Sequence, residues 1–216
     1  MLGLTALLAS PAMAQRGRGG RGGMGGPAGL VNNKGVQKEL KLTDEQVKKA
    51  EDALKTIREK HQEEFAGIRD LPQEERGEKF QALNKTVGEE QMKALSDILS
   101  ADQIKRLKQI SLQTRGAQAF NDAEVQKELK LTDDQKDKIK TINDDARQEM
   151  GSIFQGGGDF QENQKKIAAL RKETMEKVSG VLTDDQKKAW KDMTGDPFEV
   201  KFEFGQGGRG KKKGGV

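Results

Sequence analysis

The feature that most constrains the fold of this chain is an internal repeat. Residues 36–46 read VQKELKLTDEQ and residues 125–135 read VQKELKLTDDQ, so the two segments differ at one position of eleven. A second related pair follows, with LSADQ at 99–103 and LTDDQ at 182–186. The first pair is offset by 89 residues and the second by 83, so the second copy is six residues shorter in its middle. Two landmarks at nearly the same offset indicate that one unit has been duplicated in tandem.

The duplication predicts two domains of similar length, at about 31–119 and 120–204. After the first landmark of each unit, apolar residues recur at spacings of three and four, the period of an amphipathic helix. This period is interrupted at Leu71-Pro72 in the first unit and at three glycines, 156–158, in the second. We therefore expect each unit to hold a short helix, two long helices that form an antiparallel hairpin, and a final helix. The predicted fold class is all-α, with two tandem helical-hairpin units.

Each unit contains two LTxxQ elements, whose chemistry is that of a helix start. The Thr or Ser side chain can accept a hydrogen bond from the backbone N–H three residues later, and the Gln side chain can reach back to complete a capping box. Acidic residues in the first turn are favoured there by the helix dipole. Capping is a sufficient explanation of the motif without a ligand. The motif residues are Leu42, Thr43, Gln46, Leu99, Ser100, Gln103, Leu131, Thr132, Gln135, Leu182, Thr183 and Gln186.

The composition favours thin helices over one thick core, because 34% of the residues are charged and 32% are hydrophobic. A long amphipathic helix needs only a narrow apolar stripe. The chain has no cysteine and a single histidine, which excludes disulfides, zinc–thiolate sites and histidine-based triads. No pair of carboxylates, nucleophile or glycine-rich phosphate loop is placed for catalysis. We expect neither an enzyme nor a bound cofactor or metal. The weaker alternative is loose Ca²⁺ binding by the aspartate pairs at 133–134, 144–145 and 184–185, none of which has EF-hand spacing.

The single histidine, His61, lies on the apolar stripe of the first long helix, which continues from Val47 to Ile68. We expect His61 to be a packed or hydrogen-bonded residue. The alternative is a pH-sensitive group at an interface, because the charge of histidine changes near neutral pH.

The N-terminus is expected to be an export signal. A short apolar run ends in Ala12-Met13-Ala14, which fits the apolar region and cleavage site of a secretory signal peptide over residues 1–14. The alternative is a frayed apolar terminus. Cleavage after Ala14 predicts a periplasmic or secreted protein.

Two glycine-rich segments, 15–30 (QRGRGGRGGMGGPAGL) and 205–216 (GQGGRGKKKGGV), flank the helical part. Glycine loses much backbone entropy on ordering, so we expect both segments to be disordered tails. They hold 7 of the 39 basic residues and no acidic ones. The residues that could bind a polyanion are therefore Arg16, Arg18, Arg21, Arg209, Lys211, Lys212 and Lys213.

One segment departs from the helical pattern. Residues 198–204 read FEVKFEF and alternate apolar and polar residues, as a strand does. The sequence offers no partner strand. The favoured interpretation is an extended arm that packs its Phe side chains on the bundle, and the alternative is an edge offered to a partner.

Paired LTxxQ motifs in a charged helical chain with an export signal and no cysteine resemble the Spy/CpxP family of periplasmic proteins. The resemblance covers about three quarters of the chain. It implies a thin α-helical hairpin that dimerises into a curved cradle. Spy-like members bind unfolding clients without ATP, and CpxP-like members inhibit an envelope stress sensor.

The sequence departs from the family pattern in three ways. It holds two units in one chain, which implies either a dimer or an intramolecular pseudo-dimer. It carries Gly/Arg-rich tails, and it lacks the histidines of the metal-handling relatives.

Two functions are compatible with these observations. The first is an ATP-independent holdase or envelope-stress adaptor, whose partners are partly folded clients or a sensor domain. Lysine-rich helix faces would supply its positive charge, at Lys48, Lys49, Lys105, Lys108, Lys136, Lys138, Lys140, Lys187 and Lys188. The alternative is a structural or polyanion-binding envelope protein that acts through its tails on an anionic polymer or lipid. No nucleic-acid partner is expected, because of the export signal and because the tails lack interleaved aromatic residues.

Overall fold

The computed structural model describes residues 26–201, and within this range it consists of helices without a strand. The all-α prediction is confirmed. The first unit contains α1 (Pro27–Val31), α2 (Lys34–Glu39), α3 (Asp44–Lys60), α4 (Gln62–Gly67), the 3-10 helix η2 (Ile68–Asp70), α5 (Gln73–Ile98) and α6 (Ala101–Arg115). The second contains the 3-10 helix η3 (Gly116–Asn121), α7 (Ala123–Glu128), α8 (Asp133–Gln155), α9 (Phe160–Val181) and α10 (Asp184–Thr194). No helix in the described range is long and apolar enough to span a membrane.

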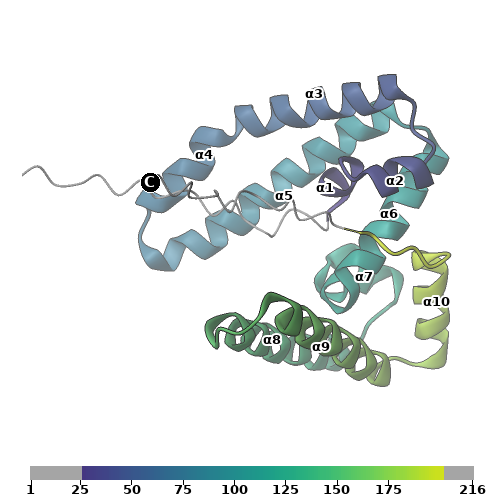
Figure 1. The fold of residues 1–216 in the computed structure, drawn as a ribbon. Coiled ribbons are helices and arrows are strands. Elements are labelled where there is room, and N and C mark those ends of the chain that lie inside the picture. The colour runs from purple at the N-terminus through teal and green to yellow at the C-terminus, as the bar shows by residue number, and fades with distance from the viewer. Residues whose placement is uncertain (1–25, 202–216) are drawn as a thin grey trace, which may run out of the picture.

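The two hairpins, α3/α5 and α8/α9, lie one above the other and are joined on one side by α6 and α10 (Figure 1). Helix α10 packs against α6, so the two units contact each other. The described chain therefore has the outline of a letter C, with one hairpin in each arm (Figure 1).

All four predicted capping boxes are present. At the start of α3, the hydroxyl of Thr43 accepts a hydrogen bond from the backbone N–H of Gln46 at 3.1 Å. The Gln46 side-chain oxygen in turn accepts one from the backbone N–H of Thr43, also at 3.1 Å. The same reciprocal pairs start α6, α8 and α10. Each box satisfies two backbone donors that a helix start otherwise leaves unpaired.

The duplication extends to individual hydrogen bonds. The Gln37 amide donates to the carbonyl of Val31, and the Gln126 amide donates to the carbonyl of Phe120, 89 residues later, both at 3.0 Å. Segment η3 thus stands in the second unit where α1 stands in the first. Within the described residues, the repeated structure therefore includes Pro27–Val31 and 116–121.

The expectation of a disordered segment over 15–30 is wrong at its C-terminal end. Residues 27–31 form α1, and the side chains of Leu30 and Val31 are completely buried in the core of the first unit. Burial of these two apolar side chains offsets the entropy lost when the segment is ordered. Residues 1–25, which include the predicted signal peptide, lie outside the described part of the chain.

Each unit has its own small core. In the first, Leu30 and Val31 pack with apolar residues of α3, α5 and α6, including Leu54, Leu95 and Ile110. In the second, Phe120 from η3 is fully buried and packs with Val125, Ile139 and Val178. Its ring lies 4.3 Å from that of Trp190 on α10, measured between centroids. Two narrow cores agree with the low apolar fraction of the sequence.

The segment after α10 is an extended arm, as favoured from the sequence. Phe198 and Val200 pack against the core of the first unit, although the sequence had assigned residues 120–204 to the second. The Gln113 side chain on α6 accepts a hydrogen bond from the backbone N–H of Phe198 at 2.7 Å. Asn33 donates to the carbonyl of Lys201 at 2.8 Å. The arm therefore ties the end of the second unit to the first, while residues 202–204 lie outside the described range.

The first long helix differs from its prediction. It does not continue to Ile68 but ends at Lys60, and α4 begins at Gln62. The junction residue is His61, with φ −98° and ψ 5°. The equivalent helix of the second unit, α8, is continuous over 23 residues. The predicted breaks near Pro72 and at 156–158 are confirmed, and positive φ angles at Gly157 and Gly158 form the second turn.

Candidate functional site

A cavity of about 930 Å³ opens beside the second hairpin. One side is formed by α8 and α9, another by residues 113–118 at the end of α6 and the start of η3, and a third by residues 198–200 of the C-terminal arm. Gly26 completes the lining. The cavity therefore depends on the contact between the units, because residues 198–200 line it while they pack against the core of the first unit.

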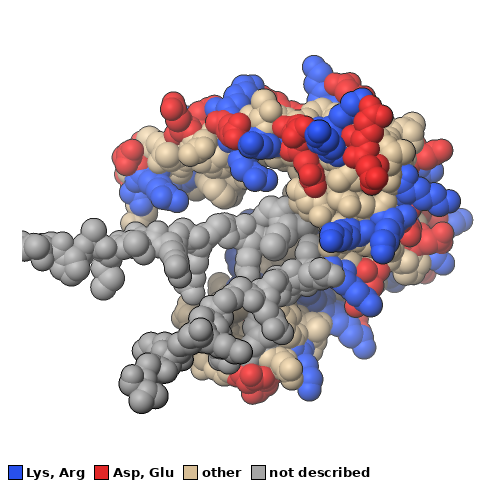
Figure 2. Space-filling model, turned by 45° about the horizontal axis from the view of Figure 1, so that its top comes forward, with Lys and Arg blue, Asp and Glu red and all other residues tan. Residues whose placement is uncertain are grey.

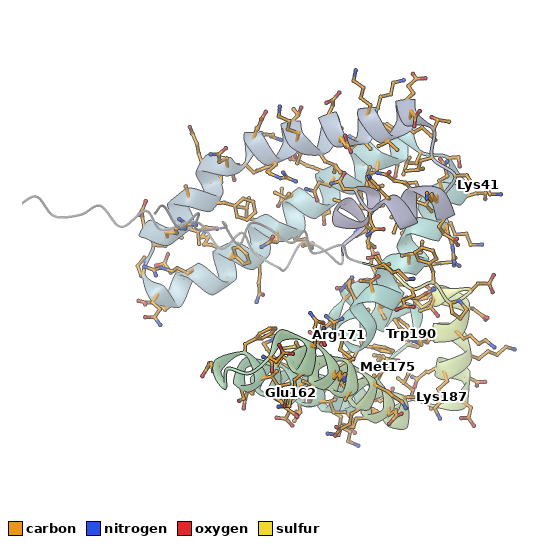
Figure 3. All side chains as sticks on the ribbon, viewed as in Figure 1. Lys41, Glu162, Arg171, Met175, Lys187 and Trp190 are labelled. Atoms are coloured by element: carbon orange, nitrogen blue, oxygen red, sulfur yellow. The ribbon has the colours of Figure 1, made fainter. Side chains whose placement is uncertain are left out.

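Apolar side chains form the inner lining of this cavity. Met150 on α8 and Leu170 and Met175 on α9 face it, together with Phe198 and Val200 of the arm. Figure 3 shows Met175 and the neighbouring Arg171 projecting from α9. Methionine side chains are unbranched and polarizable, so they adapt to ligands of different shape.

The cavity carries an excess of positive charge. Four cationic residues line it, Arg115, Arg147, Arg171 and Lys172, against one carboxylate, Glu199. They differ in how far nearby acidic groups neutralise them.

Arg115 is engaged by Asp122 through two contacts of 2.6 Å, one to each carboxylate oxygen. Arg147 and Lys172 have acidic neighbours only at 4.0 and 3.9 Å. Arg171 has no ion pair within the described residues. The charge available to an incoming anionic group is therefore concentrated at Arg147, Arg171 and Lys172.

The lysine-rich helix faces predicted from the sequence are partly neutralised. Basic and acidic side chains are interspersed over the first hairpin in Figure 2. Such exposed pairs contribute about 0–1 kcal/mol each to folding stability, so their main effect is to reduce the net positive charge of the helix faces. The pairs that involve predicted lysines are Lys49–Glu45 at 2.7 Å, Lys136–Asp133 at 2.8 Å, Lys140–Asp144 at 2.7 Å and Lys187–Asp184 at 3.1 Å.

The LTxxQ motifs do not line the cavity. Instead, the two motif glutamines of each unit pair with each other, a contact that was not predicted from the sequence. The Gln46 amide donates to Gln103 at 2.9 Å, and Gln103 donates back at 3.3 Å. Gln135 and Gln186 repeat the pair at 2.8 and 3.0 Å. The motif therefore locks two helix starts together in each unit.

Each of these glutamines also donates a hydrogen bond to a backbone carbonyl in the segment just before the helix that carries the other glutamine of the pair. Gln46 donates to the carbonyl of Ile98 at 3.2 Å, and Gln103 donates to that of Leu40 at 3.1 Å. In the second unit, the acceptors are the carbonyls of Val181 and Leu129. The occurrence of two LTxxQ elements in each unit was the sequence signal that could have suggested this pairing. Only the tertiary structure shows that the two elements contact each other.

The predicted polyanion-binding residues of the tails, Arg16, Arg18, Arg21, Arg209, Lys211, Lys212 and Lys213, lie outside the described residues. Within 26–201, no group of three His, Cys, Asp or Glu side chains is arranged to hold a metal ion. Comparison of the chain with models of protein families, with curated proteins and with solved structures gave no match.

Proposed function

We propose that this protein is an exported, ATP-independent chaperone or envelope-stress adaptor of the Spy/CpxP type. The observation that carries the proposal is the open cavity beside the second hairpin, which combines an apolar lining with a cationic side chain, Arg171, that has no ion pair within the described residues. Partly folded proteins expose apolar side chains together with charged ones. A surface that offers both kinds of contact, with adaptable methionines, suits many clients at modest affinity.

The arrangement of the two units supports the same proposal. Family members are expected to build a curved cradle from two chains, and here two units within one chain form a C-shaped body (Figure 1). The protein would then act as an intramolecular pseudo-dimer. Its partners would be partly folded clients or the exposed domain of a sensor.

The proposal is tested by light scattering from a client that aggregates on heating. We expect the wild-type protein at molar excess to suppress the scattering. Arg171→Glu reverses an exposed, unpaired charge in the cavity and should weaken suppression of an acidic client several-fold. Lys93→Glu is the matched control, because Lys93 on α5 is also exposed, has no ion pair in the described range and does not line the cavity. Absence of suppression by the wild type, or equal effects of both variants, would contradict the proposal.

The alternative is a structural or polyanion-binding envelope protein that acts through its tails. The sequence observation that favours it is the group of 7 basic residues without an acidic one in the two tails. Binding to vesicles that contain anionic lipid should then weaken steeply with salt and be lost on removal of residues 15–25 and 205–216. If that truncated chain still suppresses aggregation, the chaperone proposal is favoured.

A further inference from the structure

We propose that His61 is a protonation-controlled latch that holds the tip of the first hairpin closed. The tip comprises residues 62–86, which include α4, η2 and the first half of α5. His61 lies at the junction between α3 and α4, and its side chain is 5% exposed. This inference does not depend on the proposed chaperone function.

Both ring nitrogens of His61 face carboxylates. Nδ1 lies 2.8 Å from Glu64 Oε1 on α4, and Nε2 lies 3.0 Å from Glu90 Oε2 on α5. Lys60 at the end of α3 holds the other oxygen of Glu90 at 2.8 Å. The ring thus joins the α3–α4 junction to the opposite helix of the hairpin.

Only the protonated ring can maintain both contacts. The imidazolium ion carries an N–H on each nitrogen, whereas the neutral ring has one N–H and one lone pair. Glu64 and Glu90 accept hydrogen bonds but donate none when ionised. Loss of the proton therefore leaves a lone pair directed at one of the two carboxylates, and that contact becomes repulsive.

The local electrostatics favour the protonated ring. The hydrogen bond to Glu90 raises the pKa of His61 above its usual value of 6.5, with Glu64 adding to this effect and burial opposing it. Lys60 and His61 together lower the pKa of Glu90, which keeps that carboxylate ionised. The stabilisation by the latch is therefore fully present below about pH 6.5, the pKa of a free histidine, and is lost as the pH rises through the raised pKa of His61.

Little else holds the tip. None of the described residues from 62 to 86 is buried. The aromatic rings of Phe65 and Phe80 meet edge to face with centroids 5.9 Å apart, but Phe80 remains 51% exposed. Regions with few buried apolar contacts open locally at low free-energy cost. The His61 contacts are therefore a large share of what keeps α4 against α5.

The second unit provides an internal comparison. The position 89 residues after His61 is Met150, and α8 runs through it without a break. On the opposite helix, Ile167 and Leu170 are buried, at 8% and 5% exposure, and their counterparts 83 residues earlier are the exposed Asn84 and the buried Val87, at 9% exposure. The second hairpin has no histidine, and Ile167 adds an apolar contact at the position of Asn84, so we expect no equivalent dependence on pH there. The latch is confined to the first unit, and its release would expose Phe65 and Phe80 there.

The first measurement is the pKa of His61 in the full-length protein. Because the chain has one histidine, its ring resonances can be followed by NMR without assignment. We expect a value above 6.5. A value at or below 6.5 would overturn the proposal.

The second measurement is hydrogen–deuterium exchange of the full chain at pH values on either side of that pKa, corrected for the intrinsic exchange rate. The protection factors of residues 62–86 should fall above the pKa of His61. The largest decrease is tenfold for each pH unit by which the measured pKa exceeds that of a free histidine. Protection of α8 and α9 should not change. Equal protection of the first tip at both pH values, while His61 titrates, would overturn the proposal.

Variants separate the latch from general stability. His61→Met introduces the residue of the second unit and should make the protection of 62–86 independent of pH. Glu64→Gln alters an exposed partner and serves if His61→Met does not fold. It should lower the pKa of His61 and reduce the pH effect, and an unchanged pKa together with an unchanged pH effect would contradict the proposed role of Glu64.

Discussion

The reciprocal glutamine pair of the first unit is open to a quantitative test by a double-mutant cycle on Gln46 and Gln103. Gln46→Ala removes the acceptor for the Thr43 backbone N–H, the bond to the carbonyl of Ile98 and both bonds to Gln103. Gln103→Ala removes the equivalent set, with Ser100 and Leu40 as the other partners. The two substitutions share only the bonds between the glutamines.

The magnitude follows from these contacts. Loss of the reciprocal cap bond costs about 1 kcal/mol, and each internal hydrogen bond contributes about 0.5–1.5 kcal/mol net. Each single substitution loses the cap bond and three other hydrogen bonds, so we expect it to lower the free energy of unfolding by about 2.5–5.5 kcal/mol. In the double variant the two shared bonds are lost only once, so its cost should fall about 1–3 kcal/mol short of the sum.

The assay is urea unfolding of the full chain, followed by far-UV circular dichroism and analysed for both midpoint and slope. Gln81→Ala is the matched control, because Gln81 is exposed on α5 and makes no side-chain hydrogen bond in the described structure; its effect should stay within about 0.5 kcal/mol. The Gln135/Gln186 cycle should show the same coupling, since its geometry is the same. Additive single effects would refute the argument that the motif joins two helix starts.

Three further substitutions test the fold. Gly77→Ala should raise the free energy of unfolding by about 0.5–1 kcal/mol, because the position is helical and a Cβ there would meet nothing within 4 Å; a lower urea midpoint would contradict this. Gly195→Ala should lower the thermal midpoint, since Gly195 has φ +63° and a Cβ would lie 2.5 Å from the side chain of Gln109. Asn143→Leu should cost about 1–3 kcal/mol in urea unfolding, because it leaves the carbonyl of Ala117 without its 3.0 Å hydrogen bond; an unchanged midpoint would show that water replaces the bond.

Much of the secondary structure was predictable because its causes are local. The four helix starts follow from a hydroxyl and an amide three residues apart, which bond within one turn of chain. The hairpin turns follow from Pro72 and from the glycines at 156–158. The duplication was visible because it is a property of the sequence itself.

Predictions from local sequence patterns were wrong or incomplete where a segment is stabilised by distant parts of the chain. Helix α1 lies in a stretch that looks disordered, and it forms because Leu30 and Val31 find a core built from α3, α5 and α6. The contact of His61 with Glu90 was not predictable, because an apolar stripe does not reveal a residue 29 positions away on the opposite helix.

By itself, then, the sequence determined that the chain is helical, duplicated and capped, since these properties depend on neighbours within a few residues. The tertiary structure decided which of those elements meet. It paired the motif glutamines, placed Phe198 against the first unit, and formed the cavity in which Arg171 has no acidic partner among residues 26–201. These features depend on contacts between residues about 50 to 170 positions apart, and no local pattern in the sequence encodes such contacts.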